Sequence, residues 1–398
     1  MRCRVRIFPG FVARAVLLVC CLGTSSSAVA QTSRADIIAQ EQEQKAAHLG
    51  REGPGPLENL IVRVEQSPLI AGTTGAYPWL GSVYSGTGLG MGAGYLLRMA
   101  NGARLNGVAG LSTGGSWLLK FRAAKPEIAG EALNADLDAR YTMAKDISFY
   151  GLGPSSRVDR PVRYDYRPFE LGATASFQPA GKIRLSGKYQ WMMLRTRTHS
   201  PSAVGASDLD TDLSYHMVQA GAVLDWRESP GYSTGGGFQR VTYSLYQEAH
   251  GRPYSFQALE YEAVQHVSFL RGQYGLAARG LVTLTETEGS DGVPVVLAPG
   301  LGGGETLRGF ETRRFTDRNR LLFTGEYRWR PSRYLDMAAF FDAGKVGARR
   351  RDLGLSKLET DWGLGARLHG PDFYILRSGI AKSREGWQIV LGVGREML

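Results

Sequence analysis

The chain has few cysteines and no long apolar run beyond its N-terminus. Its three cysteines in 398 residues, Cys3, Cys20 and Cys21, all lie within residues 1–30. Without that segment the chain can form neither a disulfide nor a thiolate-ligated metal site. A membrane helix needs about 20 predominantly apolar residues, and no stretch after residue 30 approaches this length. We therefore expect neither a fold held by disulfides, nor a zinc site with cysteine ligands, nor a helical membrane protein.

Residues 1–30 have the pattern of a secretory signal peptide. Several arginines precede the apolar run 15–22, and Ala28-Val29-Ala30 fits a small-residue cleavage site. Cys20 and Cys21 lack the small residues that precede a lipoprotein cysteine, which disfavours a lipid anchor. Removing this segment lowers the formal net charge from +10, and the remaining arginines are scattered. We therefore expect an exported chain with no nucleic-acid partner.

Residues 31–76 are predicted to be a short polar periplasmic segment. GREGPGP interrupts any helix that QTSRADIIAQEQEQKAAHLG could form. The segment is too short to bury a core of its own. It leaves residues 77–398 as the main structural unit.

Residues 77–398 show repeated alternation of apolar and polar side chains. Phe323, Tyr327 and Trp329 alternate with Thr324, Glu326, Arg328 and Arg330, and the same period recurs in 133–143, 183–193, 241–245, 362–368 and 387–393. Successive side chains of a strand point to opposite faces. Burying so many ionic faces in a dry core would cost several kcal/mol per unpaired charge. The pattern instead predicts a transmembrane antiparallel β-barrel, with apolar residues facing lipid and ionic residues facing a wet interior.

The connections support an even number of strands. Short turns such as ANGA, PAGK, LRGQ, RPSR and HGPD alternate with longer links over 149–165, 195–214, 288–319 and 347–359. This arrangement predicts an all-β fold of about sixteen strands, the first over 78–85. Gly86, Gly88, Gly90, Gly92 and Gly94 are expected on one strand face, where a loop or backbone can approach closely.

The second half of the chain resembles the BamA/TamA superfamily of outer-membrane barrels, also called the bacterial surface antigen family. The resemblance is carried by the stretches LGGGETLRGF (301–310), DRNRLLFTGEYRW (317–329), FFDAGKV (340–346), DWRESPGYSTGGG (225–237) and FYGLGP (149–154). It implies a bacterial outer-membrane location and a long loop that folds its R-G-F motif, Arg308, Gly309 and Phe310, into the lumen. It also implies that Arg308 pairs with Glu326 and Asp342. An arginine fork can bridge two carboxylates in this way.

The sequence also departs from the family pattern. Residues 31–76 leave no room for a periplasmic POTRA domain, the chain ends in Met397-Leu398 without the usual aromatic residue, and Arg377-Ser378-Gly379 replaces an expected R-x-D. A separate periplasmic partner protein could take the place of the POTRA domains. Substrate capture as in full-length assembly factors is therefore not implied.

Two functions remain open. The first is insertion or translocation of outer-membrane protein or lipid, with the R-G-F loop as a brace and a weak seam between first and last strands as a lateral gate. Gly392 and Gly394 mark this seam. The alternative is a narrow channel or structural protein without assembly activity, in which the arginine only pins the loop. In both cases we expect a monomeric barrel in contact with outer-membrane lipids and lipopolysaccharide.

No enzymatic, cofactor or metal site is expected. Gly110-Leu111-Ser112-Thr113-Gly114 matches a hydrolase elbow but falls at a hairpin rather than in a strand–turn–helix context; an esterase would require Ser112 as nucleophile. Asp208, Asp210 and Asp212 lack the glycine and glutamate of a calcium loop. The run 349–351 of three arginines could meet lipopolysaccharide phosphates or be an ordinary exposed run.

Overall fold

The computed structural model describes Asn59, Arg63 and residues 73–393, with gaps at 129–131, 157, 200–208, 251–253, 288–291 and 371–373. The predicted segment 1–30 and nearly all of 31–76 lie outside these residues, so those domain boundaries stay predictions. Gly394 and Asp208 also lie outside them. In the described part no helix is long and apolar enough to cross a membrane.

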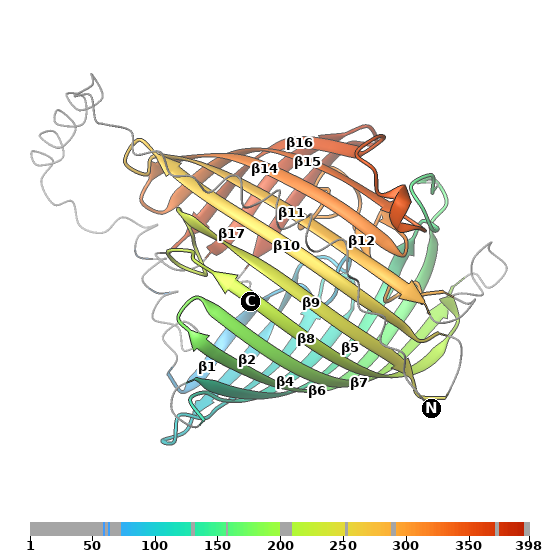
Figure 1. Ribbon diagram of the computed structural model, residues 1–398, viewed down its shortest axis with the longest axis horizontal. Coiled ribbons are helices and arrows are strands. Elements are labelled where there is room, and N and C mark those ends of the chain that lie inside the picture. The colour runs from blue at the N-terminus through green and yellow to red at the C-terminus, as the bar shows by residue number, and fades with distance from the viewer. Residues whose placement is uncertain are drawn as a thin grey trace, which may run out of the picture. The chain divides into compact units, whose positions relative to one another are not determined.

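Sixteen strands form one antiparallel sheet that curls into a barrel (Figure 1), and each pairs with its neighbours in chain order. This confirms the predicted fold class and strand number. The strands are β1 (Gly75–Gly81), β2 (Gly90–Arg98), β3 (Arg104–Ser112), β4 (Trp117–Lys125), β5 (Leu133–Phe149), β6 (Val162–Ala180), β7 (Ile183–Thr198), β8 (Asp212–Asp225), β9 (Gly236–Glu248), β10 (Phe256–Phe269), β11 (Tyr274–Thr287), β14 (Asn319–Ser332), β15 (Leu335–Gly347), β16 (Glu359–His369), β17 (Tyr374–Ser383) and β18 (Gly386–Val393). Two short strands, β12 (Gly300–Leu301) and β13 (Phe315–Thr316), pair with each other inside the long β11–β14 connection.

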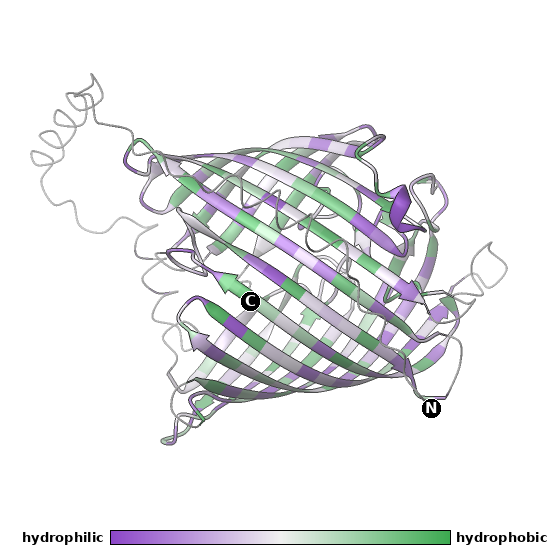
Figure 2. Ribbon diagram, in the orientation of Figure 1, coloured by the Kyte–Doolittle hydropathy of each residue, from purple (hydrophilic) through white to green (hydrophobic). Residues whose placement is uncertain are grey.

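Apolar and polar residues alternate along the strands (Figure 2), as the period-two pattern predicts. In β14, Phe323, Tyr327 and Trp329 are exposed on the outer surface, whereas Glu326 and Arg328 are buried. Exposed apolar rows of this kind recur on most strands. They form the surface that a bilayer would cover.

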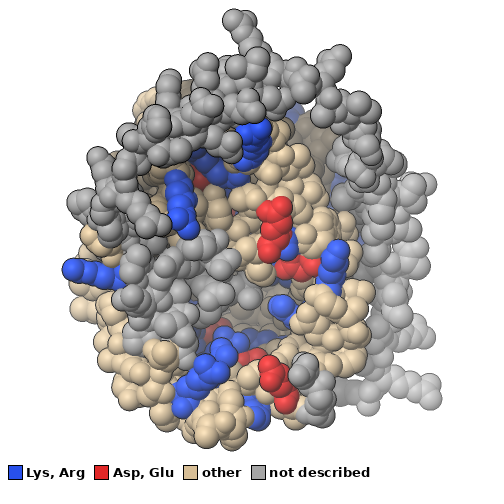
Figure 3. Space-filling model, turned by 90° about the vertical axis from the view of Figure 1, so that its left-hand side faces the viewer, with Lys and Arg blue, Asp and Glu red and all other residues tan. Residues whose placement is uncertain are grey.

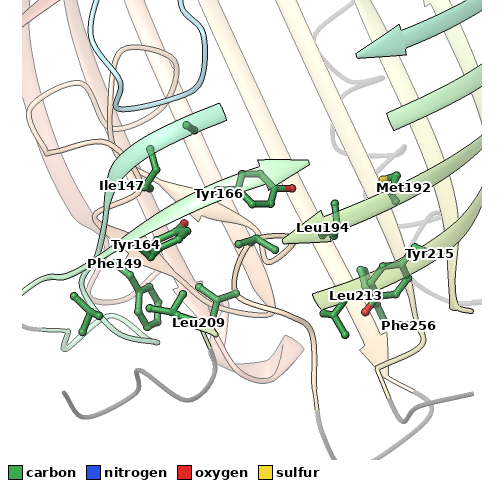
Figure 4. Close-up of a cluster of buried hydrophobic side chains, with 14 of the residues drawn as sticks. Ile147, Phe149, Tyr164, Tyr166, Met192, Leu194, Leu209, Leu213, Tyr215 and Phe256 are labelled. Atoms are coloured by element: carbon green, nitrogen blue, oxygen red, sulfur yellow. The ribbon is translucent and has the colours of Figure 1, made fainter. Parts of the chain in front are cut away.

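The interior also contains an apolar region beside the ionic one. An apolar cluster (Figure 4) fills the inner side of the β5–β10 wall where the long loops begin. Tyr164 and Tyr166 of β6 pack there with Tyr215 of β8, and Val295 and Val296 reach the cluster from the β11–β14 connection. In β6 the outer-face neighbours of Tyr164 and Tyr166 are Arg163, Asp165 and Arg167. The period of two is kept there but its sense is reversed, so the pattern alone did not show which face points inward.

The first strand starts earlier than predicted, at Gly75, and its aromatic residues explain the glycine stripe. A Cβ on Gly94 would lie 2.2 Å from the Tyr77 ring, and one on Gly110 of β3 would lie 2.3 Å from the Trp79 ring. The close approach is made by an aromatic ring of β1 at Gly94 and, as predicted, by neighbouring backbone at Gly92, where a Cβ would overlap the carbonyl oxygen of Ala109. Gly86 and Gly88 do not belong to the stripe: they lie in the β1–β2 turn with φ of 89° and 78°, which favours glycine.

Candidate functional site

The β11–β14 connection folds into the barrel and packs there through a small apolar cluster. Leu307, Phe310 and Phe315 of the connection are buried against Leu281 of β11 and Leu322 of β14. Phe310 and Phe315 meet edge to face with ring centroids 5.1 Å apart. This packing fixes the position of Arg308, between Leu307 and Phe310.

Arg308 bridges the two acids that the resemblance implied. Its Nε and Nη2 donate to the two carboxylate oxygens of Asp342 at 2.7 and 2.8 Å, and its Nη1 donates to Glu326 Oε1 at 2.7 Å. The guanidinium lies 3.5 Å from the centroid of the Phe340 ring, a cation–π contact. Burial alone would lower the pKa of Arg308, but its bonds to Asp342 and Glu326 outweigh burial and raise it. The guanidinium therefore stays charged.

Glu326 is shared by three arginines. Arg328 donates to Glu326 Oε2 through Nε and Nη2 at 3.1 and 3.0 Å, and Arg367 of β16 donates to both oxygens at 2.6 and 2.7 Å. The R-G-F arginine thus joins a network that spans β14, β15 and β16. The alternation placed Arg367 on the inner face, but nothing in the sequence linked it to Glu326.

Asp361 is a third acid at this site that the sequence reasoning did not single out. It stands directly opposite Asp342 in the β15–β16 ladder, and its side chain is buried with 1% exposure of the residue. A Cβ on Gly309 would lie 2.6 Å from the Cβ of Asp361. Gly309 is therefore required by close packing against β16, and not by an unusual backbone conformation.

The same connection is also attached to the last two strands. Arg314 is almost fully buried and donates from Nε to Glu385 at 2.9 Å, in the turn between β17 and β18. Arg377 of β17 donates to Glu305 at 2.6 Å, and Gln388 of β18 donates to Glu311 at 3.2 Å. The loop therefore links the β14–β16 wall to the final hairpin. Separations of about 70 residues hide these pairs from sequence patterns.

The sheet has a seam where β1 and β18 meet. Each of them pairs with one neighbour, β2 or β17, and no residue of the described part of β1 pairs with β18. Gly392 lies in β18 opposite Arg377, and a Cβ there would meet that arginine at an ordinary 3.4 Å. The packing would therefore tolerate a larger residue at position 392. Glycine at this position leaves the final strand weakly packed.

Pro78 interrupts the edge that β1 presents to this seam. The N–H of Met99 donates to the carbonyl of Ala103 at 2.8 Å, so odd-numbered residues of β2 bond to β3 and even-numbered ones bond to β1. Pro78 pairs with Ala93, an odd-numbered residue, so its backbone groups point away from β2 and towards the seam. Because proline has no N–H, the seven-residue strand offers the seam only two donors, from Ala76 and Leu80.

A large space lies beside the seam inside the barrel. A cavity of about 1370 Å³ is bounded by the R-G-F loop, by the start of the β1–β2 turn and by residues 388–392 of β18. The loop and this space lie against the inner side of β18, and the same space extends to Ile147 and Phe256 of the apolar cluster on the β5–β10 wall.

The β8–β9 turn crosses the end of the barrel that carries the short turns. Tyr232 of this turn donates to both carboxylate oxygens of Asp336 in β15 at 3.0 Å and stacks on His369 with centroids 3.7 Å apart. Burial raises the pKa of Tyr232, so its hydroxyl remains a donor. The motif DWRESPGYSTGGG thus carries an anchor that the resemblance alone did not identify.

The other motifs considered lie in hairpins and loops, where their side chains have local partners. Ser112 ends β3, and its Oγ accepts a hydrogen bond from the Ser116 N–H at 3.1 Å within the hairpin. Asp210 and Asp212 both pair with Arg197, at 3.5 and 2.7 Å. Within the described ranges no cluster of three or more histidine, cysteine or acidic residues could hold a metal. Arg350 pairs with Glu286 at 3.3 Å.

Comparison with known proteins gives a family. Residues 99–389 match the model described as the Omp85 superfamily domain. The fold is similar to BamA from Haemophilus ducreyi lacking POTRA domains 1–3, at 12% identity and a TM-score of 0.61, covering 80% of this chain and 68% of that one. CdiB from Acinetobacter baumannii is also similar, at 12% identity and a TM-score of 0.51; the match covers 80% of this chain but only 59% of the CdiB chain. Curated protein sequences give no match.

Proposed function

The chain belongs to the Omp85 superfamily and is a bacterial outer-membrane β-barrel, and from this premise we propose that it takes part in inserting or translocating protein or lipid at the outer membrane. The observation that carries the proposal is the seam between β1 and β18, which lacks paired residues in the described part of both strands. Unpaired backbone groups are costly in hydrocarbon. A barrel that keeps such an edge therefore has a place where its wall can open.

The contacts around the seam support a lateral gate. Pro78 limits the hydrogen bonds by which β1 can close the wall. The loop holds the other side through Arg314 and Glu385, while Arg308 anchors the same loop to β14 and β15. Opening is thus controlled by how firmly the loop holds the last hairpin.

We further propose the partners of this barrel. A separate periplasmic protein would supply the substrate-binding role, the apolar outer rows would contact outer-membrane lipids, and Arg349 to Arg351 would contact lipopolysaccharide. The barrel would act as a monomer and without enzymatic activity. Co-purification from membranes followed by mass spectrometry tests the partner; recovery of the barrel alone under mild extraction would contradict it.

A disulfide across the seam tests the gate, because residues 31–398 contain no cysteine. Leu80 of β1 and Ile389 of β18 are both exposed, and Leu80→Cys with Ile389→Cys places one cysteine on each side of the seam. The matched control, Ile380→Cys with Ile389→Cys, joins directly paired residues of β17 and β18 and leaves the seam free. The readout is the rate at which the reconstituted barrel accelerates folding of an outer-membrane protein into liposomes.

Oxidation should abolish acceleration in the seam pair, and reduction should restore it, while the control pair should remain active in both states. Full activity of the oxidised seam pair would rule out the gate.

The second candidate function is a narrow channel, which the lumenal cavity of about 1370 Å³ favours. If the pinned loop plugs a channel, Arg308→Ala should raise the single-channel conductance in planar bilayers. Unchanged conductance would argue against plugging.

A further inference from the structure

A second lumenal cavity, of about 420 Å³, lies between the β8–β9 turn and the R-G-F loop. This volume falls in the range of small-molecule sites. The end of the barrel drawn in Figure 3 is hollowed, and basic and acidic side chains line the opening. The cavity is strongly basic: seven arginines and three glutamates line it. The arginines are Arg227, Arg240, Arg279, Arg308, Arg328, Arg367 and Arg377.

Several of these guanidinium groups share a carboxylate and therefore keep unused positive charge. Glu262 accepts from Arg240 and, at 2.7 Å, from Nε of Arg279. It is nearly buried, so it is the principal counter-charge of both arginines. Arg367 shares Glu326 with two other arginines, and its Nη1 is buried without a hydrogen-bond partner. Each carboxylate thus faces more than one guanidinium and leaves an excess of positive charge, and Arg367 Nη1 is an unmet donor.

We propose that this cavity binds a phosphate ester, with Arg240, Arg279 and Arg367 as its ligands. Guanidinium forks match the geometry of phosphate oxygens, and a phosphate anion would supply the acceptors that the shared glutamates do not. Phe238 and Val264 give the cavity an apolar side, which fits the carbon part of an ester better than a bare anion. The phosphate could belong to a lipid headgroup or to a soluble metabolite.

A purely structural network predicts something different from a binding site. If Glu262 only braces the two strands, Glu262→Gln should weaken the barrel and leave phosphate binding unaffected. In a phosphate site Glu262 competes with the ligand for the same donors. Its neutralisation should then free Arg240 and Arg279 and tighten binding. The two explanations therefore predict different changes for one isosteric substitution.

The test is isothermal titration of the full-length barrel in neutral detergent with glycerol 3-phosphate. Glu262→Gln should bind about tenfold more tightly than the parent chain, and Arg240→Gln with Arg279→Gln at least tenfold more weakly. The matched control, Arg197→Gln, removes an arginine that pairs with Asp212 outside the cavity and should leave binding unchanged. Raising the salt concentration should weaken binding.

The source of the phosphate is decided by competition. If nanodiscs of phosphatidylglycerol displace glycerol 3-phosphate and nanodiscs of phosphatidylcholine do not, an anionic lipid headgroup is the ligand. Displacement by inorganic phosphate alone identifies a soluble phosphate. No heat of binding in the parent chain, or equal affinity in the parent and Glu262→Gln, would overturn the proposal. If the double arginine variant does not fold, the difference in affinity between the parent and Glu262→Gln tests the proposal by itself. None of these measurements depends on the lateral gate.

Discussion

Replacing Arg308 with alanine should destabilise the barrel mainly through Asp342. That carboxylate is fully buried and receives both Nε and Nη2 of Arg308. Glu326 would keep Arg328 and Arg367, but Asp342 would lose its arginine while facing Asp361 in the ladder. Removing one partner of a buried ion pair costs about 3–5 kcal/mol, and loss of the cation–π contact with Phe340 adds about 1 kcal/mol. We expect a loss of about 4–6 kcal/mol in the free energy of unfolding.

Urea titration in detergent, followed by the heat-dependent mobility shift of folded barrels on gels, measures this loss. The unfolding free energy of Arg308→Lys should lie between those of the parent and Arg308→Ala, because lysine keeps the charge but cannot donate two parallel hydrogen bonds as arginine does. Arg350→Gln removes an exposed pair with Glu286 and should cost less than about 1 kcal/mol. If Arg308→Ala changes the unfolding free energy no more than Arg350→Gln does, the network does not brace the barrel.

Three further changes probe the loop and the seam. Gly309→Ala should cost about 1–3 kcal/mol by overpacking against β16, whereas Gly187→Ala, where a Cβ meets nothing within 4 Å, should be neutral or better in the same urea titration. Arg314→Gln should release the last hairpin and speed amide hydrogen exchange in β17 and β18 relative to β6; equal rates would refute the attachment. Pro78→Ala should restore a seam donor and slow exchange in β18, and unchanged exchange there would contradict the assigned orientation of residue 78.

The overall fold could be predicted because a membrane barrel keeps its period-two signal on nearly every strand. In β14, for example, Trp329 faces outward and Arg328 faces inward, and this alternation is what made the strand recognisable. The signal failed where its physical basis disappears. In β1, Pro78 and the flanking glycines are poor strand formers, and the strand was placed three residues too late. In β6 the pattern is reversed, because Tyr164 and Tyr166 face inward while Arg163 and Asp165 face outward.

The candidate site could be predicted only in part. The positions of Glu326 and Asp342 relative to Arg308 followed from a motif and from strand faces. The partners of Arg314 and Tyr232 did not, because Glu385 and Asp336 are brought to them by loop paths that have no periodic pattern. Asp361 was on the expected face, but only the strand register shows that it stands beside Asp342.

The uneven filling of the interior has a mechanical consequence. One side of the barrel contains a close-packed cluster like the centre of a globular domain, and such packing resists deformation. Near the first and last strands the wall is supported instead by two aromatic rings that pack against glycines, and by a few ion pairs that one loop makes with the last hairpin. Thermal motion should therefore concentrate in the strands on either side of the break in the wall, so that the molecule yields there while the rest of its circumference keeps its shape.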